Sequence, residues 1–273
     1  MKQLELLGLQ GDDSRLAPLH IRNPLGEDTA VMRTTLAPDM FRVLGYNMSQ
    51  RNREALLCEF GTLYDPGTKT DEGLITETRA LCLGAYGEEL DFYAVRDAVL
   101  LLLEQSGIQW DIVSGGEPYL HPGRSARIMV KDCCIAVVGE VHPDAAKRFD
   151  LSERAFLAEI DLAWLSACVK PFDAVTALPR TPAVTRDIAL VVDEKQPLLP
   201  LQREIIRAAG KLLESIELFD VFRGKQLPEG KKSAAFSLTL RGADKTLEES
   251  EIADIMARVT KTLKEKFKAE IRS

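Results

Sequence analysis

Two hydrophobic periods alternate along the first 170 residues, and they predict a mixture of helices and strands. Apolar residues recur at helical spacing over 36–48, where Pro38 suits a first turn, and over 89–106, where Gly107 is a typical stop. Alternating or continuously apolar segments predict strands at 55–60, 79–85, 126–130, 133–141 and 155–161.

Turn residues between these strands favour direct antiparallel connections. Tyr64-Asp65-Pro66-Gly67 predicts the reversal between the first two strands, and Lys131-Asp132 predicts a tight hairpin. Pro143 is placed to open a short helix that runs to about Phe149. Hairpins and flanking helices favour an α+β fold over a doubly wound parallel sheet.

The last third of the chain has a sharper pattern, with the order βαββαβ of the ferredoxin-like fold. Thr246 and Glu249 have the spacing of a capping box, which predicts that the second helix begins there. The expected strands are 187–192, 215–222, 233–240 and 269–272, and the expected helices are 198–209 and 246–267.

The third of these strands predicts which face of the sheet is open. Ala234, Phe236, Leu238 and Leu240 alternate with the small or hydroxyl residues Ser233, Ala235, Ser237 and Thr239. Since successive side chains point to opposite faces, the first set lies beneath the helices and the second set faces away. Such a face suits RNA, although it lacks the aromatic pair of RNA-recognition modules; packing on a neighbouring protein is the alternative.

Charge separates the two parts of the chain. The 273 residues are 45% hydrophobic and 28% charged, which is ordinary for a globular protein. Residues 1–178 carry 17 Lys and Arg against 27 Asp and Glu, whereas residues 179–273 carry 18 against 15. The second part is therefore the plausible site for a polyanion. Three prolines between residues 171 and 182 predict a linker, so we expect domains at 1–170 and 181–273 joined by 171–180.

Several protein classes are excluded. No apolar run approaches the ~18 residues of a membrane span, and the N-terminus lacks the features of a secretory signal, so a cytoplasmic protein is expected. The histidines are not at metal-ligand spacing, and no zinc site is expected. No cysteine pair has the Cys-x-x-Cys spacing, so all five cysteines are interpreted as buried, reduced thiols: Cys58, Cys82, Cys133, Cys134 and Cys168.

Three clusters in the first part have residues that can carry chemistry. They are 23–35, which contains Arg33; 121–126, which contains His121; and 139–143, which contains His142. Either histidine could act as a general base, but no serine or cysteine in an elbow pattern accompanies it. Glycine-rich phosphate-binding motifs are also absent from the sequence. No catalytic residue and no metal ligand is therefore assigned.

Taken together, these segments resemble the C-terminal part of the bacterial phenylalanyl-tRNA synthetase beta subunit. They follow the family's order from residue 23 to the C-terminus. The segments are NPLGEDTAVMRTTLAP at 23–38, HPGRSA at 121–126, GEVHP at 139–143, TPAVTRDIALVVDE at 181–194, LFDVFRG at 218–224, KKSAAFSLTLR at 231–241, and the Thr246-Leu247 opening with Glu249 and Glu251.

The resemblance implies that residues 1–170 form most of a module similar to class II synthetase catalytic domains, with an antiparallel sheet and flanking helices but without activating residues. Catalysis in this family belongs to the alpha subunit, the partner of beta in an (αβ)₂ heterotetramer. The intact enzyme uses ATP and Mg²⁺, and neither is expected to bind this segment. The family's beta chain is longer, so the sequence is expected to be a C-terminal portion of it.

The resemblance also implies that residues 181–273 are a ferredoxin-fold anticodon-binding domain for the anticodon stem-loop of tRNA-Phe. The matching contact positions are Ala183, Asp220, Phe222 and Ser233; family members commonly have tyrosine where Phe222 stands. Arg186 and Lys232 are candidates for phosphate contacts, with an ion pair from Arg186 to Asp187 or Glu194 as the alternative. Two other functions stay open, an autonomous enzyme of the class II synthetase or biotin-ligase type and a protein-interaction module without RNA binding.

Overall fold

The computed structural model describes residues 2–26, 29–169, 179, 181–224, 226–242 and 245–272. The chain divides into two compact units, Met1–Asp173 and Ala174–Ser273. Apart from Pro179, the linker predicted at 171–180 lies outside the described residues. The predicted domain limits therefore stay a prediction.

The first unit is built on a six-stranded sheet with the order β1-β2-β6-β5-β4-β3. Every neighbouring pair of strands is antiparallel, which confirms the α+β prediction. The strands are β1 (Ala55–Lys69), β2 (Ile75–Tyr86), β3 (Asp111–Ser114), β4 (Leu120–Val130), β5 (Cys133–Val141) and β6 (Ala155–Asp161).

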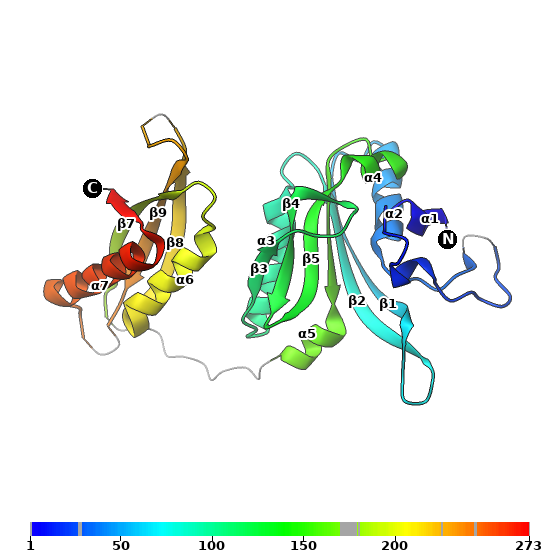
Figure 1. The fold of residues 1–273 in the computed structure, drawn as a ribbon, viewed down its shortest axis with the longest axis horizontal. Coiled ribbons are helices and arrows are strands. Elements are labelled where there is room, and N and C mark those ends of the chain that lie inside the picture. The colour runs from blue at the N-terminus through cyan, green and yellow to red at the C-terminus, as the bar shows by residue number, and fades with distance from the viewer. Residues whose placement is uncertain are drawn as a thin grey trace. The chain divides into compact units, whose positions relative to one another are not determined.

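Helices cover both faces of this sheet. Figure 1 shows α2 and α3 on opposite sides of it. Pro38 lies in the first turn of α2, as predicted. α3 begins at Phe92 instead of residue 89, because the Asp91 carboxylate caps it by accepting a hydrogen bond from the N–H of Ala94. The helices of this unit are α1 (Lys2–Glu5), the 3₁₀ helix η1 (Ser14–Leu16), α2 (Ala37–Ser49), α3 (Phe92–Gln105), α4 (Pro143–Arg148) and α5 (Leu162–Cys168).

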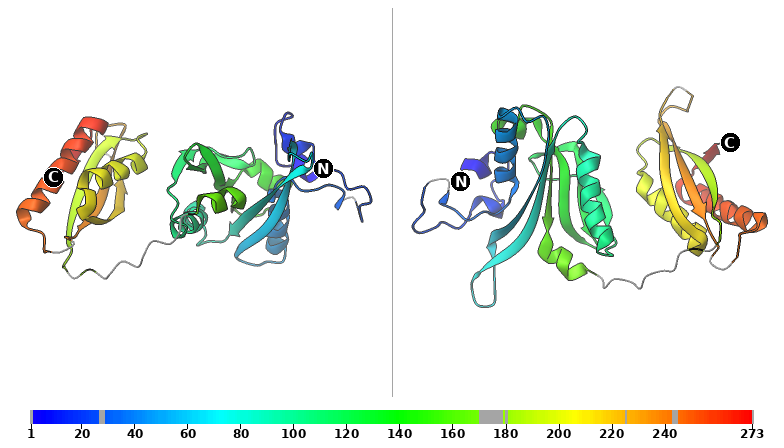
Figure 2. Two further views of the ribbon diagram at one scale, coloured as in Figure 1. Left: turned by 90° about the horizontal axis from the view of Figure 1, so that it is seen from below. Right: turned by 180° about the vertical axis from the view of Figure 1, so that it is seen from behind.

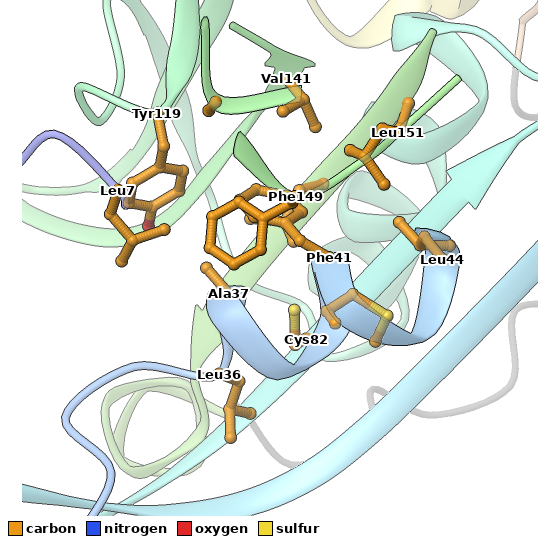
Figure 3. Packing of buried hydrophobic residues seen from close by; sticks show 14 of the residues in the cluster. Leu7, Leu36, Ala37, Phe41, Leu44, Cys82, Tyr119, Val141, Phe149 and Leu151 are labelled. Carbon is orange, nitrogen blue, oxygen red and sulfur yellow. The ribbon is translucent and has the colours of Figure 1, made fainter. Parts of the chain in front are cut away.

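Each face of the sheet has its own hydrophobic core. On the α2 side the Phe41 ring meets Tyr119 and Phe149 edge to face, with ring centroids 5.9 and 5.2 Å away. Figure 3 shows Phe41 and Phe149 near the first turn of α2, where Ala37 lies, and Tyr119 to one side, next to Leu7. On the opposite side Val99 and Leu103 of α3 are fully buried against the sheet. The alternation along β2 and β6 therefore serves two cores at once.

The first predicted turn is wrong. Residues 64–67 continue β1, and the reversal comes later, where the N–H of Thr70 donates to the carbonyl of Leu74 and Gly73 has a φ of 79°. The Asp65 side chain accepts hydrogen bonds from the N–H of Gly67 and the hydroxyl of Thr68, and the pairing with β2 is irregular between Asp65 and Lys69, so this sequence forms a local irregularity within β1 instead of the reversal. The hairpin arm consequently extends beyond the rest of the sheet (Figure 2).

The second unit has the predicted βαββαβ order, and its four-stranded sheet has the order β10-β7-β9-β8. Helices α6 and α7 pack together and cover one face, where Phe236 and Leu238 are fully buried. The elements are β7 (Val184–Asp193), α6 (Leu198–Ala209), the 3₁₀ helix η3 (Gly210–Leu212), β8 (Leu213–Phe222), β9 (Lys231–Leu240), α7 (Glu249–Phe267) and β10 (Glu270–Arg272).

The predicted cap of α7 is displaced by two residues. Glu248, not Thr246, is the N-cap, and its N–H donates to the Glu251 carboxylate at 3.0 Å. Leu247 precedes the cap and is buried in the same core as Ile252, four positions into the helix. This hydrophobic staple sets the start of the helix, because it ties the incoming chain to the core.

The interpretation of the cysteines holds only in part. All five cysteines are free, as expected. Cys82 is buried, but Cys58 and Cys134 are exposed, so their prediction as buried residues is wrong. Both lie in strands whose outer positions remain uncovered, which an apolar sequence pattern does not reveal. Among the described helices, none is long and apolar enough to span a membrane.

Gly84 provides a test of how closely α2 approaches the sheet. A Cβ atom at Gly84 would lie 2.5 Å from Cγ of Met40, a residue of α2 that is 3% exposed. We expect Gly84→Ala to lower the free energy of unfolding by about 1–3 kcal/mol, as overpacking of a core does. Urea denaturation measures this change.

Gly11→Ala is the matched control, because a Cβ at Gly11 meets no atom within 4 Å. It should leave the urea midpoint nearly unchanged. Equal stability of the Gly84→Ala variant and the parent would contradict the close packing of α2 on β2.

Candidate nucleic-acid interface

The face of the second sheet that points away from α6 and α7 is the candidate site. On β9 the even-numbered residues 234–240 are buried in the core, whereas Ala235, Ser237 and Thr239 are half-buried on the other side. The predicted open face is therefore confirmed. The strand register decides which residues from β7, β8 and β10 share it.

Three of the predicted contact residues lie together at one end of this open face. Ser233 pairs with Val191 on one side and with Phe222 on the other. In the next row Ala235 pairs with Ala189 and Asp220. Asp220, Phe222 and Ser233 thus form one patch, which we call the Phe222 patch.

Phe222 is the aromatic group that this patch offers. Its side chain is half-buried, and a Cβ at Gly224 would lie 2.8 Å from Cζ of its ring. Glycine at this position therefore leaves room for the ring after the end of β8. Ser233 is only 5% exposed, so a ligand reaches mainly Phe222 and the exposed Asp220.

Charge changes along the open face. The row beyond Ala235 places Asp187 and Glu217 on either side of Ser237, which makes the middle of the face acidic. At the Phe222 end, Lys231 lies 3.1 Å from Asp193 and Arg223 lies 3.6 Å from Glu194. Among the described residues, the Phe222 end therefore lacks the unpaired acidic row of the middle, and its basic side chains are balanced by carboxylates.

Arg186 and Lys232 lie on the helix side of the sheet. Arg186 pairs across the strands with Leu238 and donates to both carboxylate oxygens of Glu249 at 2.9 Å, instead of the expected Asp187 or Glu194. Lys232 is 6% exposed. Its pKa is lowered, mainly by burial and to a smaller extent by the charge of Arg223. Neither side chain belongs to the Phe222 patch.

Ala183 is at the other end of the sheet. It precedes Val184, which pairs with Leu240, whereas the first row of the Phe222 patch, that of Asp220, meets β7 six residues later at Ala189. At ~3.3 Å per residue the separation along β7 is about 20 Å. The structure therefore does not bring the six predicted RNA-contact residues together in one patch.

Arg272 is the residue that the sequence reasoning missed. It pairs with Ala189, so it falls in the row that contains Asp220. The signal was present, because the predicted last strand and the ferredoxin-like strand order together place alternate residues of 270–272 on the open face. Lys225, which the sequence also offers as a basic residue, lies outside the described residues.

The histidine clusters of the first unit are brought together by the fold. The rings of His121 and His142 stack with centroids 6.3 Å apart. Each Nδ1 accepts a backbone N–H at 3.1 Å, from Gly123 and from Asp144 respectively. These contacts stabilise a turn and the N-terminus of α4, so both histidines have a structural role.

The arginines of the same clusters hold carboxylates. Arg124 binds both oxygens of Glu140, at 2.7 and 2.9 Å, and Arg154 donates to the same carboxylate at 2.5 Å. Arg33 donates to Glu59 at 2.5 Å and to the carbonyl of Thr62. Within the described residues, no group of three or more His, Cys, Asp or Glu side chains is arranged to hold a metal ion.

Comparison with known proteins gives two family matches. The model described as the phenylalanyl tRNA synthetase beta chain CLM domain matches residues 1–162. The model described as the ferredoxin-fold anticodon binding domain matches residues 179–272.

Curated relatives match nearly the whole chain. The phenylalanine–tRNA ligase beta subunit of Clostridium acetobutylicum is 39% identical over 264 residues, which are 96% of this chain and 33% of that protein. The corresponding subunit of Coxiella burnetii is 32% identical over 263 residues, 93% of this chain and 33% of that protein. The chain thus spans about a third of the length of these relatives. A solved pyrrolysyl-tRNA synthetase from Desulfitobacterium hafniense has a TM-score of 0.48 and 17% identity, with 60% of this chain and 58% of that chain covered.

The Glu140 cluster gives a pH-dependent prediction. Burial alone would raise the pKa of Glu140, but the hydrogen bonds from Arg154 and Arg124 outweigh it and hold the pKa below its usual value. The stability that this pair contributes is therefore present above the unfolded-state pKa of ~4.3 and is lost as the pH falls through the folded-state pKa. We expect Glu140→Gln to lower the free energy of unfolding by about 1–3 kcal/mol at pH 7, as measured by urea denaturation.

The cost should shrink as the pH is lowered from about 5 towards 3, since the parent then loses the same charge. Glu88→Gln, at an exposed position, is the control and should change stability by less than about 0.5 kcal/mol. A cost that stays constant over this pH range would rule out ionised Glu140 as its source.

Proposed function

Since the chain belongs to the phenylalanyl-tRNA synthetase beta chain family, we propose that it binds the anticodon stem-loop of tRNA-Phe and docks the catalytic alpha subunit. The assembly would be the cytoplasmic (αβ)₂ ligase that joins phenylalanine to tRNA-Phe with ATP and Mg²⁺. No residue of this chain is assigned to either cofactor, and its own part is noncatalytic. The observation that carries the RNA-binding role is the Phe222 patch on an anticodon-binding fold.

Stacking is the interaction that the Phe222 patch supplies. An unpaired base of an anticodon loop has an exposed π face, and stacking on an aromatic side chain is worth ~1–3 kcal/mol per base. The small residues Ala189 and Ala235, both in the row of Asp220, leave that part of the surface next to Phe222 free of large side chains. Asp220 adds carboxylate acceptors for base N–H groups, and Arg272 adds a cation for a phosphate.

The remaining predicted residues have weaker support. Ala183, Arg186 and Lys232 stay proposed contacts, but each would have to reach RNA that extends beyond the Phe222 patch. Arg186 would have to share its guanidinium with Glu249, and Lys232 would have to leave a buried position. The acidic row of Asp187 and Glu217 opposes such an extension across the open face, because it repels phosphates.

The docking role is supported by the free edge of the first sheet. β1 is an edge strand, and its residues Leu56 and Phe60 are 62% and 68% exposed. With the exposed Cys58 between them they form an apolar strip on the face where α3 packs over β2, β5 and β6. Apolar side chains beside unpaired backbone groups are typical of a strand that meets a partner chain.

Phe222→Ala tests the RNA-binding role. The variant should bind the tRNA-Phe anticodon stem-loop about tenfold more weakly, because one base stack is lost. Phe222→Tyr keeps the ring and should retain the affinity. Fluorescence anisotropy with the cognate loop and an anticodon-altered loop measures both affinity and selectivity.

Phe219→Ala is the matched control, since Phe219 is on the same strand, is 53% exposed, and has no partner in the register with β9. Arg272→Ala should reduce the slope of log affinity against log salt by about one. Full affinity in a folded Phe222→Ala variant would refute the assignment. Pyrophosphate exchange by this chain alone would favour an autonomous enzyme instead.

Leu56→Ser with Phe60→Ser tests the docking role. The double variant should lose co-elution with the alpha subunit in size-exclusion chromatography, because the apolar strip is removed. Leu101→Ser is the control, as Leu101 is 56% exposed on α3. If the double variant co-elutes as the parent does, the alpha subunit docks elsewhere.

A further inference from the structure

A small cavity opens in the first unit, far along the chain from the Phe222 patch. Its volume is about 170 Å³, and six separate segments line it, including β1 and β5. Arg15 comes from η1, Thr78 from β2, and Glu159 from β6, while Glu117 and Tyr119 come from the segment between β3 and β4. None of these residues has a part in the proposed RNA contact or in the apolar strip of β1.

Carboxylates dominate the polar lining of the cavity. Arg15 adds a guanidinium to this lining. It already forms ion pairs with Asp13, at 2.7 Å, and with Glu117, at 2.6 Å. Burial opposes the charge of Arg15, but these hydrogen bonds outweigh it and raise its pKa. Glu117 uses one oxygen for Arg15, so its other oxygen remains available to a ligand.

Glu159 adds a carboxylate without a cationic partner in direct contact. It accepts the hydroxyl of Thr35 at 2.6 Å and the N–H of Leu36 at 3.4 Å. Burial is the largest influence on this carboxyl and raises its pKa. A cation in the cavity would lower the pKa of Glu159 again, because an opposite charge stabilises a buried carboxylate.

Tyr119 is the second, independent sign of a ligand site. It is 1% exposed and lines the cavity, and the described residues hold no hydrogen bond to its hydroxyl. Figure 3 shows its ring, with the hydroxyl oxygen in red, on the Leu7 side of the aromatic cluster. Buried tyrosine hydroxyls usually have a partner. Burial, followed by the charges of Glu159 and Glu117, raises the pKa of this phenol, so it stays neutral.

The rest of the lining adds Cys134 and Asp161, whose carboxylate already accepts the N–H of Trp164, and hydrocarbon from Leu63, Ala80, Ile135 and Val137. A cavity of ~150 Å³ is large enough for benzene, so this one has room for a short alkyl body. An ammonium group has three N–H donors, one for each of Glu117, Glu159 and Tyr119. We propose that the cavity binds small primary alkylammonium ions, with these three residues around the nitrogen and the aliphatic residues around the chain.

The experiment compares three probes of one shape with the full chain. n-Butylammonium is the cation, n-butanol the neutral probe and butyrate the anion, and saturation-transfer NMR titrations give their affinities. The expected result is saturable binding of n-butylammonium with at least tenfold higher affinity than the other two. Glu159→Gln and Glu117→Gln should each weaken it at least tenfold, and Tyr119→Phe should weaken it several-fold.

Two controls separate this site from its surroundings. Asp71→Asn, at the exposed turn between β1 and β2, should leave the affinity unchanged, and so should Phe222→Ala, which concerns only the RNA-binding role. Thermal unfolding by circular dichroism checks the fold of each variant; Tyr119→Phe, which keeps the buried ring, decides the matter if Glu159→Gln does not fold. Equal affinity for the three probes, no saturable binding of n-butylammonium, or full binding by a folded variant that lacks the acceptor would overturn the proposal.

Discussion

The alternation of side chains along paired strands is the constraint on which both units depend. On β9, Phe236 and Leu238 can be buried under the helices only if Ser233 and Ala235 face the other way. A shift of one residue in register would exchange the two sets and expose the core. The cost of exposing Phe236 therefore holds Phe222 and Ser233 side by side on the open face.

The same constraint places charged groups within the first unit. β6 directs Phe156, Ala158 and Ile160 into the α3 core, so Glu159 must face the opposite side, where α2 lies. A carboxylate there is stabilised by the Thr35 hydroxyl instead of by water. Apolar packing on one face thus puts a polar group into a cavity on the other.

Sequence patterns were reliable where they described a periodic face and less reliable at the ends of elements. The strand and helix order of the second unit follows directly from periodicity, because 2.0 and 3.6 residue repeats are distinct. The reversal expected at Tyr64 fails, since pairing with β2 continues to Lys69 past an irregularity at Asp65. The cap expected at Thr246 fails, since burial of Leu247 sets the helix start two residues later. Ends depend on contacts that single-segment patterns do not contain.

The amino-acid sequence alone determined the α+β class, the ferredoxin-like order and the open face of β9, because all three follow from local spacing. Its resemblance to a family supplied the anticodon-binding expectation, and the family matches support it. Only the tertiary structure decided which residues share a surface. Pairing of distant strands joins Arg272 to the row of Asp220, separates Ala183 from it, and turns Arg186 and Lys232 towards the helices. The physical reason is that register is set by burial of the core across strands far apart in the chain, which no single segment encodes.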